Sequence, residues 1–258
     1  MSPLKTRAER GDPTLAFGAA IAEEHGAMTT QQGPDPKDLD RVAQTALTRV
    51  ADGMILGLGT GRAAEAFIEA LGRRVRGGLR VKGVPTSNRS AELARRVNIE
   101  VVSLEEVDHL DIAFDGADEV TPELELTKGL GGALLRERVV AFEASLFVVL
   151  VTPEKLVPRL GTRAPIPIEV VPFAAPSVTR HLRKLGGTPV VRKKADSYPY
   201  MTDNQNWILD TSFGAIDTPA AIEAAVLAIP GVVDTGLFLG MASVVLVGEP
   251  GQVRELKR

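Results

Sequence analysis

The sequence predicts an α/β protein, with a mostly parallel, doubly wound sheet in a first domain and a smaller α+β domain after it. Between residues 36 and 151, short apolar runs alternate with amphipathic helical patterns, as in parallel strands joined by helices. Four prolines then interrupt this alternation in the segment APIPIEVVPFAAP, after Gly161. Beyond that segment the pattern reads strand, helix, strand, strand, helix, strand, which is the ferredoxin-like order.

In the first domain each element follows from its own periodicity. Apolar residues at helical spacing run from Leu39 to Val50, which predicts a helix within residues 36–50. Continuous apolar runs predict buried strands at Met54–Leu58, Leu79–Val84, Glu100–Leu104, Leu110–Phe114 and Leu146–Val151. Helical patterns between these strands lie at Ala63–Leu71, Ser87–Val97 and Ala133–Glu143, with Ser87 or Asn88 as the N-cap of the second.

The second domain is predicted from shorter patterns. Its strands are expected at Ile166–Val171, Pro189–Lys193, Trp207–Thr211 and Val232–Phe238. Its helices are expected at Ser177–Leu185, which ends at a glycine pair, and at Pro219–Ile229. The last apolar run, Ser243–Val247, is expected to return to the first sheet. The predicted bounds are therefore 36–161 with 239–258 for the first domain and 162–238 for the second.

Residues 1–35 are predicted to form a disordered extension outside the core, because they mix Gly, Pro, Gln, Thr and charges without a sustained apolar period. Met28 is an alternative start. The N-terminus lacks the apolar core of a signal peptide, and no apolar run approaches the roughly 20 residues that span a bilayer. We therefore expect a cytoplasmic protein with no membrane partner.

Charge and composition favour a small-molecule ligand over a polymer. The 258 residues carry a net charge of −3, so nucleic acid is not attracted in general and an anionic ligand needs local positive groups. Without Cys there is no disulfide, thiol nucleophile or Cys-based metal site. The three His residues are scattered along the sequence, so no metal site is predicted from them either.

A glycine-rich turn, GLGTG at Gly57–Gly61, follows the first predicted strand and opens a helix. Small residues there let a ligand approach backbone N–H groups at the positive end of the helix, which suits a phosphate. The third glycine of a dinucleotide motif is misplaced, and no Gly-Lys-Ser/Thr follows, which disfavours a nicotinamide cofactor or a nucleoside triphosphate. A tight turn that needs glycine only for its backbone angles is the alternative.

The 23 residues from Asp115 to Glu137 concentrate charge where a buried strand ends, which is where open α/β sheets bind ligands. Asp115 and Asp118 are separated by Gly116 and Ala117, which are small enough for the loop to approach a substrate closely. The two carboxylates suit a metal, a shared proton or sugar hydroxyls, and hydroxyl recognition is favoured because further metal ligands are lacking. The alternative is that they cap loops and face water.

Lys128 lies in the glycine-rich turn KGLGG, where an ammonium and exposed backbone amides can together stabilise an oxyanion. A solvated surface lysine is the alternative. Glu137 projects from a helical face that otherwise carries Ala133, Leu134 and Ala141. A carboxylate on such a face is desolvated, its pKa rises, and it becomes a better general base near neutral pH. The alternative for Glu137, an i,i+4 surface pair, lacks a partner because position 141 is Ala.

Basic residues follow the next predicted strand. Lys155, Arg159 and Arg163 are predicted to form a cluster suited to a phosphate, with a plain solvated face as an equal alternative. Trp207 and Phe213 are expected to pack in the second domain rather than to stack on a ligand.

Taken together, these motifs resemble the A type of ribose-5-phosphate isomerase. The resemblance runs from about residue 38 to the C-terminus and rests on GLGTGRAAEAFIEAL, FDGADEV, Lys128-Gly129, Ala133-Leu134 followed by Arg136-Glu137, PIPIEVVP, RKLGG, TDNQNWILD and AIPGVVDTGLF. It implies a Rossmann-like domain that carries a small α+β domain, usually in a homodimer or homotetramer. It also implies cofactor-free interconversion of ribose 5-phosphate and ribulose 5-phosphate in the pentose phosphate pathway, without a metal.

Position by position, the resemblance implies roles for the charged stretch. Glu137 resembles the catalytic base that moves a proton between C2 and C1 through a cis-enediolate. Asp115 is implied to assist opening of the furanose ring and Asp118 to hold the hydroxyls. Lys128 is implied to stabilise the enediolate oxygen together with the Gly129 amide. The residues implied to bind the sugar and its phosphate are Thr60, Gly61, Arg62, Ala63, Gly116, Ala117, Gly129, Leu130, Gly131 and Lys155.

Several positions depart from the family pattern. Arg62 and Ala63 stand where Ser-Thr usually follows the glycine-threonine-glycine turn, and Leu130 interrupts a glycine run that is usually unbroken. Arg41 stands where the family often has a phosphate-contacting lysine, which keeps the charge but changes the shape. These departures leave two alternatives open, a non-catalytic sugar-phosphate-binding protein and a CoA-transferase-like enzyme on the same scaffold.

Overall fold

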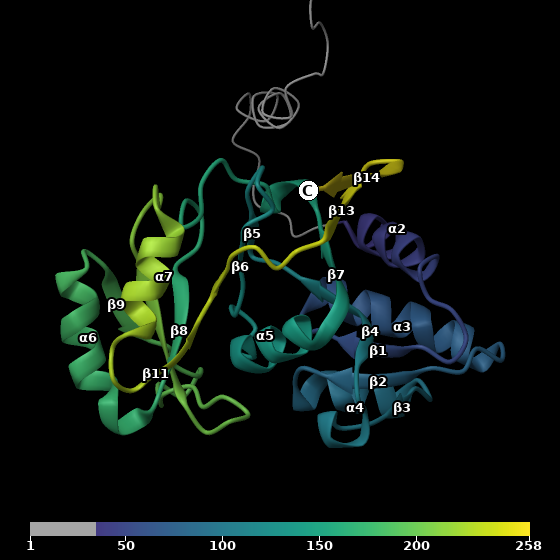
Figure 1. The fold of residues 1–258 in the computed structure, drawn as a ribbon, viewed down its shortest axis with the longest axis horizontal. Coiled ribbons are helices and arrows are strands. Elements are labelled where there is room, and N and C mark those ends of the chain that lie inside the picture. The colour runs from purple at the N-terminus through teal and green to yellow at the C-terminus, as the bar shows by residue number, and fades with distance from the viewer. Residues whose placement is uncertain (1–34) are drawn as a thin grey trace, which may run out of the picture. The chain divides into compact units, whose positions relative to one another are not determined.

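The computed structural model describes residues 35–258, so the extension predicted at 1–35 lies outside the described residues except for Asp35. Helix α2 (Pro36–Leu47) begins directly after Asp35, whose carboxylate accepts a hydrogen bond from the Lys37 amide at 2.9 Å. Along 35–258 no helix combines the length and the apolar character needed to cross a membrane. The strands of this part form three sheets (Figure 1).

The largest sheet has seven strands in the order β14-β13-β7-β4-β1-β2-β3. Their bounds are β1 (Ile55–Leu58), β2 (Lys82–Pro85), β3 (Glu100–Val101), β4 (Leu110–Gly116), β7 (Ala144–Val151), β13 (Val244–Glu249) and β14 (Gln252–Lys257). All neighbours are parallel except β13 and β14. The predicted mostly parallel sheet is confirmed, including the return of the last apolar run. Because the strand order reverses between β1 and β4, their carboxyl ends border the crevice where such sheets bind ligands.

Helices pack on this sheet. Helices α2, α3 (Arg62–Arg76) and α4 (Asn88–Arg96) enclose an apolar core against the strands, in which Phe67 stacks on Phe114 with 4.1 Å between ring centroids. Helix α5 (Leu134–Glu143) packs on strands β4 and β7 and also contacts the second sheet. It lies close to β1, because a Cβ at Gly57 would be only 2.4 Å from the Val140 side chain. Glycine at this position therefore sets how near α5 comes to the sheet.

The second sheet is antiparallel, in the order β11-β8-β10-β9. Its elements are β8 (Ile166–Val170), α6 (Ala175–Lys184), β9 (Thr188–Val191), β10 (Trp207–Ser212), α7 (Pro219–Leu227) and β11 (Val232–Thr235). The predicted β-α-β-β-α-β order is confirmed. Trp207 and Phe213 pack against its apolar core, as expected. The bounds of the two domains stay a prediction.

A third sheet, in the order β12-β6-β5, was not expected from the sequence. It consists of β5 (Glu119–Val120), β6 (Leu126–Thr127) and β12 (Leu237–Phe238), which are too short to show a period. The single strand predicted at Val232–Phe238 is therefore wrong, because Gly236 separates β11 from β12. A Cβ at Gly236 would lie 2.3 Å from the carbonyl oxygen of Lys128, so only glycine lets the two segments pass this closely.

Candidate active site

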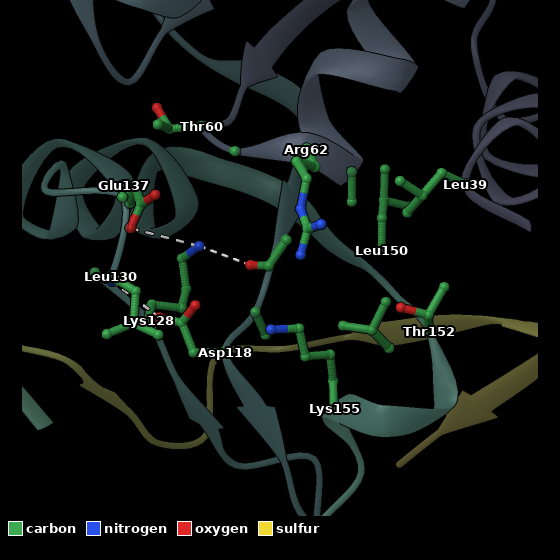
Figure 2. Close-up of a pocket in the computed structure, with 17 residues that line it drawn as sticks. Leu39, Thr60, Arg62, Asp118, Lys128, Leu130, Glu137, Leu150, Thr152 and Lys155 are labelled. Atoms are coloured by element: carbon green, nitrogen blue, oxygen red, sulfur yellow. Dashed lines mark hydrogen bonds and ion pairs between the residues drawn. The ribbon is translucent and has the colours of Figure 1, made fainter. Parts of the chain in front are cut away.

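A cavity of about 290 Å³ lies at the carboxyl ends of β1, β4 and β7 (Figure 2). Its lining includes every residue expected to bind the substrate, namely Thr60, Gly61, Arg62, Ala63, Gly116, Ala117, Gly129, Leu130, Gly131 and Lys155. Asp118, Lys128 and Glu137 line it as well, whereas Asp115 lies behind its wall. The fold thus brings residues as far apart in the sequence as Leu39 and Lys155, 116 positions, to one cavity.

Three charged side chains meet at the cavity wall. Strand β4 supplies Asp115, Lys128 follows β6, and α5 supplies Glu137. The Lys128 ammonium lies 3.0 Å from Asp115 Oδ2 and 3.5 Å from Glu137 Oε2, and it donates a hydrogen bond to the Gly116 carbonyl at 2.7 Å. All three charged side chains are at most 3% exposed, so the alternative of a solvated lysine is wrong. Within 35–258, neither of those carboxylate oxygens has a donor in hydrogen-bonding geometry.

Burial and mutual charge determine how these groups titrate. Burial raises the pKa of Glu137 to about 8; Lys128 opposes this shift, and Asp115 and Asp118 add to it. Burial also raises the pKa of Asp115 against the opposing effect of Lys128. For Lys128, burial alone would lower the pKa, but the surrounding carboxylates outweigh it and the pKa is raised. The predicted desolvation of Glu137 is confirmed, and Lys128 stays protonated at neutral pH.

The Asp115 carboxylate is fixed from two sides. Its Oδ1 accepts hydrogen bonds from the Thr60 amide at 3.0 Å and from the Gly116 amide at 2.8 Å. It fits because position 59 is glycine, where a Cβ would lie 2.2 Å from Asp115 Cγ. The glycine-rich turn after β1 therefore needs Gly59 to make room for a carboxylate, and its next amide helps to hold that carboxylate in place.

The turn that follows Lys128 places backbone groups beside the cavity. Gly129 and Gly132 have φ angles of +99° and +84°, which favour glycine. Leu130 is not among the residues with positive φ, so a side chain is accommodated at this departure from the family pattern. Its amide donates to Asp118 Oδ2 at 3.0 Å. Asp118 is thus tied to the turn, and Leu130 leaves the backbone of the turn in a conformation that a side chain tolerates.

Two cations extend into the other part of the cavity. Arg62 is the first residue of α3, and Lys155 belongs to a 3₁₀ helix at Pro153–Lys155. Figure 2 shows their side chains reaching into the cavity from opposite sides. Neither forms an ion pair within the part of the chain that the structure describes. Together with the N-terminus of α3, they make this end of the cavity suitable for a dianion.

Comparison with known proteins shows which family the chain belongs to. A model of ribose 5-phosphate isomerase A (phosphoriboisomerase A) matches residues 82–252. The chain belongs to this family. The ribose-5-phosphate isomerase A of Roseiflexus sp. strain RS-1 is 49% identical over 218 residues, which cover 84% of this chain and 94% of the relative. That of Thermomicrobium roseum is 49% identical over 220 residues, covering 85% and 93%.

Solved structures of family members have the same fold. A D-ribose-5-phosphate isomerase in complex with phospho-erythronic acid matches with a TM-score of 0.85 and 38% identity, over 88% of this chain and all of that one. The ribose 5-phosphate isomerase A of Methanocaldococcus jannaschii matches with a TM-score of 0.82 and 43% identity, over 87% of this chain and all of that one. The predicted fold class, α/β with a second α+β part, is confirmed.

The prediction that Lys155, Arg159 and Arg163 form one basic cluster for a phosphate is wrong, because only Lys155 lines the cavity. Arg159 pairs with Asp217, and the Arg163 side chain donates to a backbone carbonyl nearby. The physical reason lies in the loop, where the Arg163 amide donates to the buried Glu119 carboxylate at 2.6 Å. This bond holds the Arg163 backbone at Glu119, and neither residue lines the cavity.

Arg41 does not stand in for the family's phosphate-contacting lysine. Its guanidinium bonds to Asp38 at 2.5 Å and to the Glu249 carbonyl at 2.8 Å, so it ties α2 to the end of β13. The residue of α2 that lines the cavity is Leu39. Because Arg62 enters the cavity from α3, the positive charge there comes from a different helix than the resemblance implied.

Sequence reasoning missed part of the cavity wall and its support. Leu150, Val151 and Thr152 line the cavity at the end of β7, and their place at the carboxyl end of a parallel strand was the available signal. The Thr60 hydroxyl lies 2.7 Å from that of Thr86 and donates to Ser87 Oγ at 2.8 Å. Ser87 is also the N-cap of α4, as one of the two predicted candidates. The Thr60 hydroxyl is thus held by other side chains.

Proposed function

We propose that this protein interconverts D-ribose 5-phosphate and D-ribulose 5-phosphate, in the non-oxidative pentose phosphate pathway. The observation that carries the proposal is the buried Glu137 carboxylate, whose pKa is raised to about 8 beside the Lys128 ammonium in the cavity. An aldose-ketose shift needs one base that serves two adjacent carbons and a fixed positive environment for the oxyanion. These two side chains supply both.

The proton transfers assign a step to each of these groups. Glu137 removes the proton from C2 of open-chain ribose 5-phosphate, and the electrons of the broken C–H bond leave a cis-enediolate. Lys128 and the amides of the turn stabilise the negative charge on oxygen, and the hydroxyl proton passes from O2 to O1. Glu137 then returns its proton to C1, which gives the ketose. The base ends in the form in which it began, so no cofactor is consumed.

The two aspartates have different positions and therefore different proposed roles. Asp118 lines the cavity beside Leu130 and accepts hydrogen bonds from the sugar hydroxyls through its remaining lone pairs. Asp115 contacts Lys128 rather than the cavity. It assists ring opening through Lys128, whose ammonium it holds at the wall where the ring oxygen of the furanose binds.

The phosphate binds at the opposite end of the cavity. Arg62 and Lys155 provide the charge, and the amides at Gly61–Ala63 provide donors at the start of α3. The ligand of the solved relative, phospho-erythronic acid, carries a phosphate and a carboxylate. We propose that the same cavity binds this compound, with its phosphate between the two cations and its carboxylate near Lys128.

The deciding assay is conversion of ribose 5-phosphate to ribulose 5-phosphate by the purified chain in the presence of EDTA. Steady turnover supports the proposal, because the mechanism uses only side chains and amides. Absence of turnover, or its loss on adding the chelator, would sink it. Binding of ribose 5-phosphate without turnover, and without exchange of the C2 hydrogen with solvent, would favour the non-catalytic alternative. The relatives named above are isomerases by name and do not favour the CoA-transferase-like alternative.

We further propose that the protein acts in the cytoplasm as a homodimer or homotetramer. Phe142 and Val139 on α5 are 78% and 38% exposed, and an apolar pair on one helix face is typical of a subunit contact. Light scattering of the purified protein gives the mass directly, and a monomer at micromolar concentration would contradict the assembly. Fractionation of the source cells tests the compartment.

A further inference from the structure

Arg192, which directly follows β9, reaches from the second sheet to the turn after Lys128. Its Nη1 donates to the carbonyl oxygens of Gly129 at 2.9 Å and Leu130 at 3.0 Å. Its Nε and Nη2 donate to the two carboxylate oxygens of Asp210 at 2.9 and 2.5 Å. One guanidinium therefore joins a bidentate ion pair to two consecutive peptide groups of the turn that borders the cavity.

The arginine is itself held in place. Its backbone N–H donates to Ile208 at 2.8 Å, and its carbonyl accepts from the Tyr200 amide at 2.8 Å. The guanidinium carbon lies 5.9 Å from the centre of the Tyr200 ring. The side chains of Arg192 and Asp210 are only 13% and 23% exposed. Because the Arg192 guanidinium is held by Asp210 and its backbone by hydrogen bonds to neighbouring segments, the Gly129 and Leu130 carbonyls that it binds have little freedom to rotate.

Holding these carbonyls also orients amides. In a trans peptide the C=O and the N–H of the next residue point in opposite directions. With Gly129 O and Leu130 O turned toward Arg192, the N–H groups of Leu130 and Gly131 face the other way. The Leu130 N–H donates to Asp118, which lines the cavity, so this N–H points toward the cavity side of the turn. Gly131 lines the cavity too, and its N–H has no acceptor within residues 35–258.

We propose that Arg192 is a positioning residue for the isomerisation: it clamps the turn so that the Gly131 amide and Lys128 face the enediolate oxygen together. The proposal rests on the proposed function. The second sheet thereby contributes to the chemistry without touching the substrate. Arg192 donates four hydrogen bonds from three nitrogens, whereas a lysine has three N–H groups on one nitrogen, so lysine cannot reproduce the whole set.

The test compares Arg192→Lys with Arg183→Lys, which changes an exposed arginine on α6 in the same part of the fold. For Arg192→Lys we expect kcat to fall about 10- to 100-fold with KM within about threefold, because a misplaced oxyanion donor affects mainly the transition state. The inhibition constant for phospho-erythronic acid, whose carboxylate we place near Lys128, should rise about tenfold. Arg183→Lys should change none of these values.

A second variant, Asp210→Asn, keeps the inference testable if Arg192→Lys folds poorly. It removes the ion pair that orients Arg192 but keeps the arginine, so we expect a smaller loss of kcat in the same direction. A lowered melting temperature with unchanged kcat in both variants would leave Arg192 a purely structural role and overturn the inference. Absence of turnover in the wild-type protein would instead refute the proposed function, and the inference with it.

Discussion

The ammonium nitrogen of Lys128 lies 3.5 Å from Oε2 of Glu137, and both side chains are almost completely buried. Despite this neighbour, the pKa of Glu137 is raised to about 8, since burial and the two nearby aspartates outweigh the attraction of the lysine. Glu137 is thus a carboxylate that gains and loses its proton near neutral pH, while Lys128 keeps its charge. The separation of these two titrations is what a base and an oxyanion-stabilising group require.

The pH profile tests this separation. Because the base must be ionised in the free enzyme, kcat/KM for ribose 5-phosphate should rise about tenfold per pH unit below pH 8 and level off above it. The measurement is initial rates between about pH 6 and pH 9.5 in buffers of constant ionic strength. A profile that is flat across this range would contradict the raised pKa.

Glu137→Gln should abolish proton transfer while keeping the shape of the cavity. We expect kcat to fall by about a thousandfold or more, with the affinity for phospho-erythronic acid within about threefold of the wild type. Glu143→Gln, at the exposed end of the same helix, is the matched control and should leave kcat unchanged. Near-normal kcat in Glu137→Gln would remove Glu137 from its role as the base.

Glu137→Gln should also change how the stability of the fold depends on pH. Glu137 has a folded pKa above its ordinary value, so its ionisation favours the unfolded chain. The contribution of the neutral Glu137 side chain to the free energy of unfolding is fully present below its ordinary pKa of 4.5. It is lost as the pH rises toward the folded pKa of about 8. Glu137→Gln avoids this loss, so its melting temperature should exceed that of the wild type above pH 8, and the difference should shrink toward pH 5. A difference that grows on acidification would contradict this sign.

Lys128→Met should destabilise the fold because Asp115 and Glu137 would remain buried without their cation. We expect a loss of about 3 kcal/mol in the free energy of unfolding near pH 8, measured by urea denaturation. The double variant Lys128→Met/Asp115→Asn removes one of the two acids and should recover part of this loss without recovering activity. Full activity in either variant would exclude Lys128 from stabilising the enediolate.

Arg62→Ser tests the phosphate end of the cavity. Loss of one of two cations should raise KM for ribose 5-phosphate about tenfold, with kcat within about threefold, since the phosphate is bound equally in the ground and transition states. Arg76→Ser, at the other end of α3, is the matched control. If KM is unchanged, the guanidinium of Arg62 does not bind the substrate, and Lys155 with the α3 amides must suffice.

Much of the fold and of the cavity could be predicted from local patterns. The parallel strands and their helices follow from apolar periodicity, and the residues expected to bind the substrate all lie around one cavity. Those residues follow the carboxyl ends of strands, where side-chain chemistry and sheet geometry act together. The exceptions are Arg41 and the pair Arg159 and Arg163, whose charges suggested phosphate contacts and whose partners are other residues of the protein.

The sequence by itself determined the order of most elements of the two larger sheets, the buried position of Glu137 on a small apolar helix face, and the family. Only the tertiary structure decided which charges meet. Three contacts join residues that are distant in sequence. Lys128 lies 3.0 Å from Asp115, Gly59 leaves space for the Asp115 carboxylate, and Arg192 donates to the Gly129 and Leu130 carbonyls. Periodicity reports which face of an element is buried, but it carries no information on what lies across from that face. Pairing between distant groups depends on distances of a few ångströms, which only the packed chain defines.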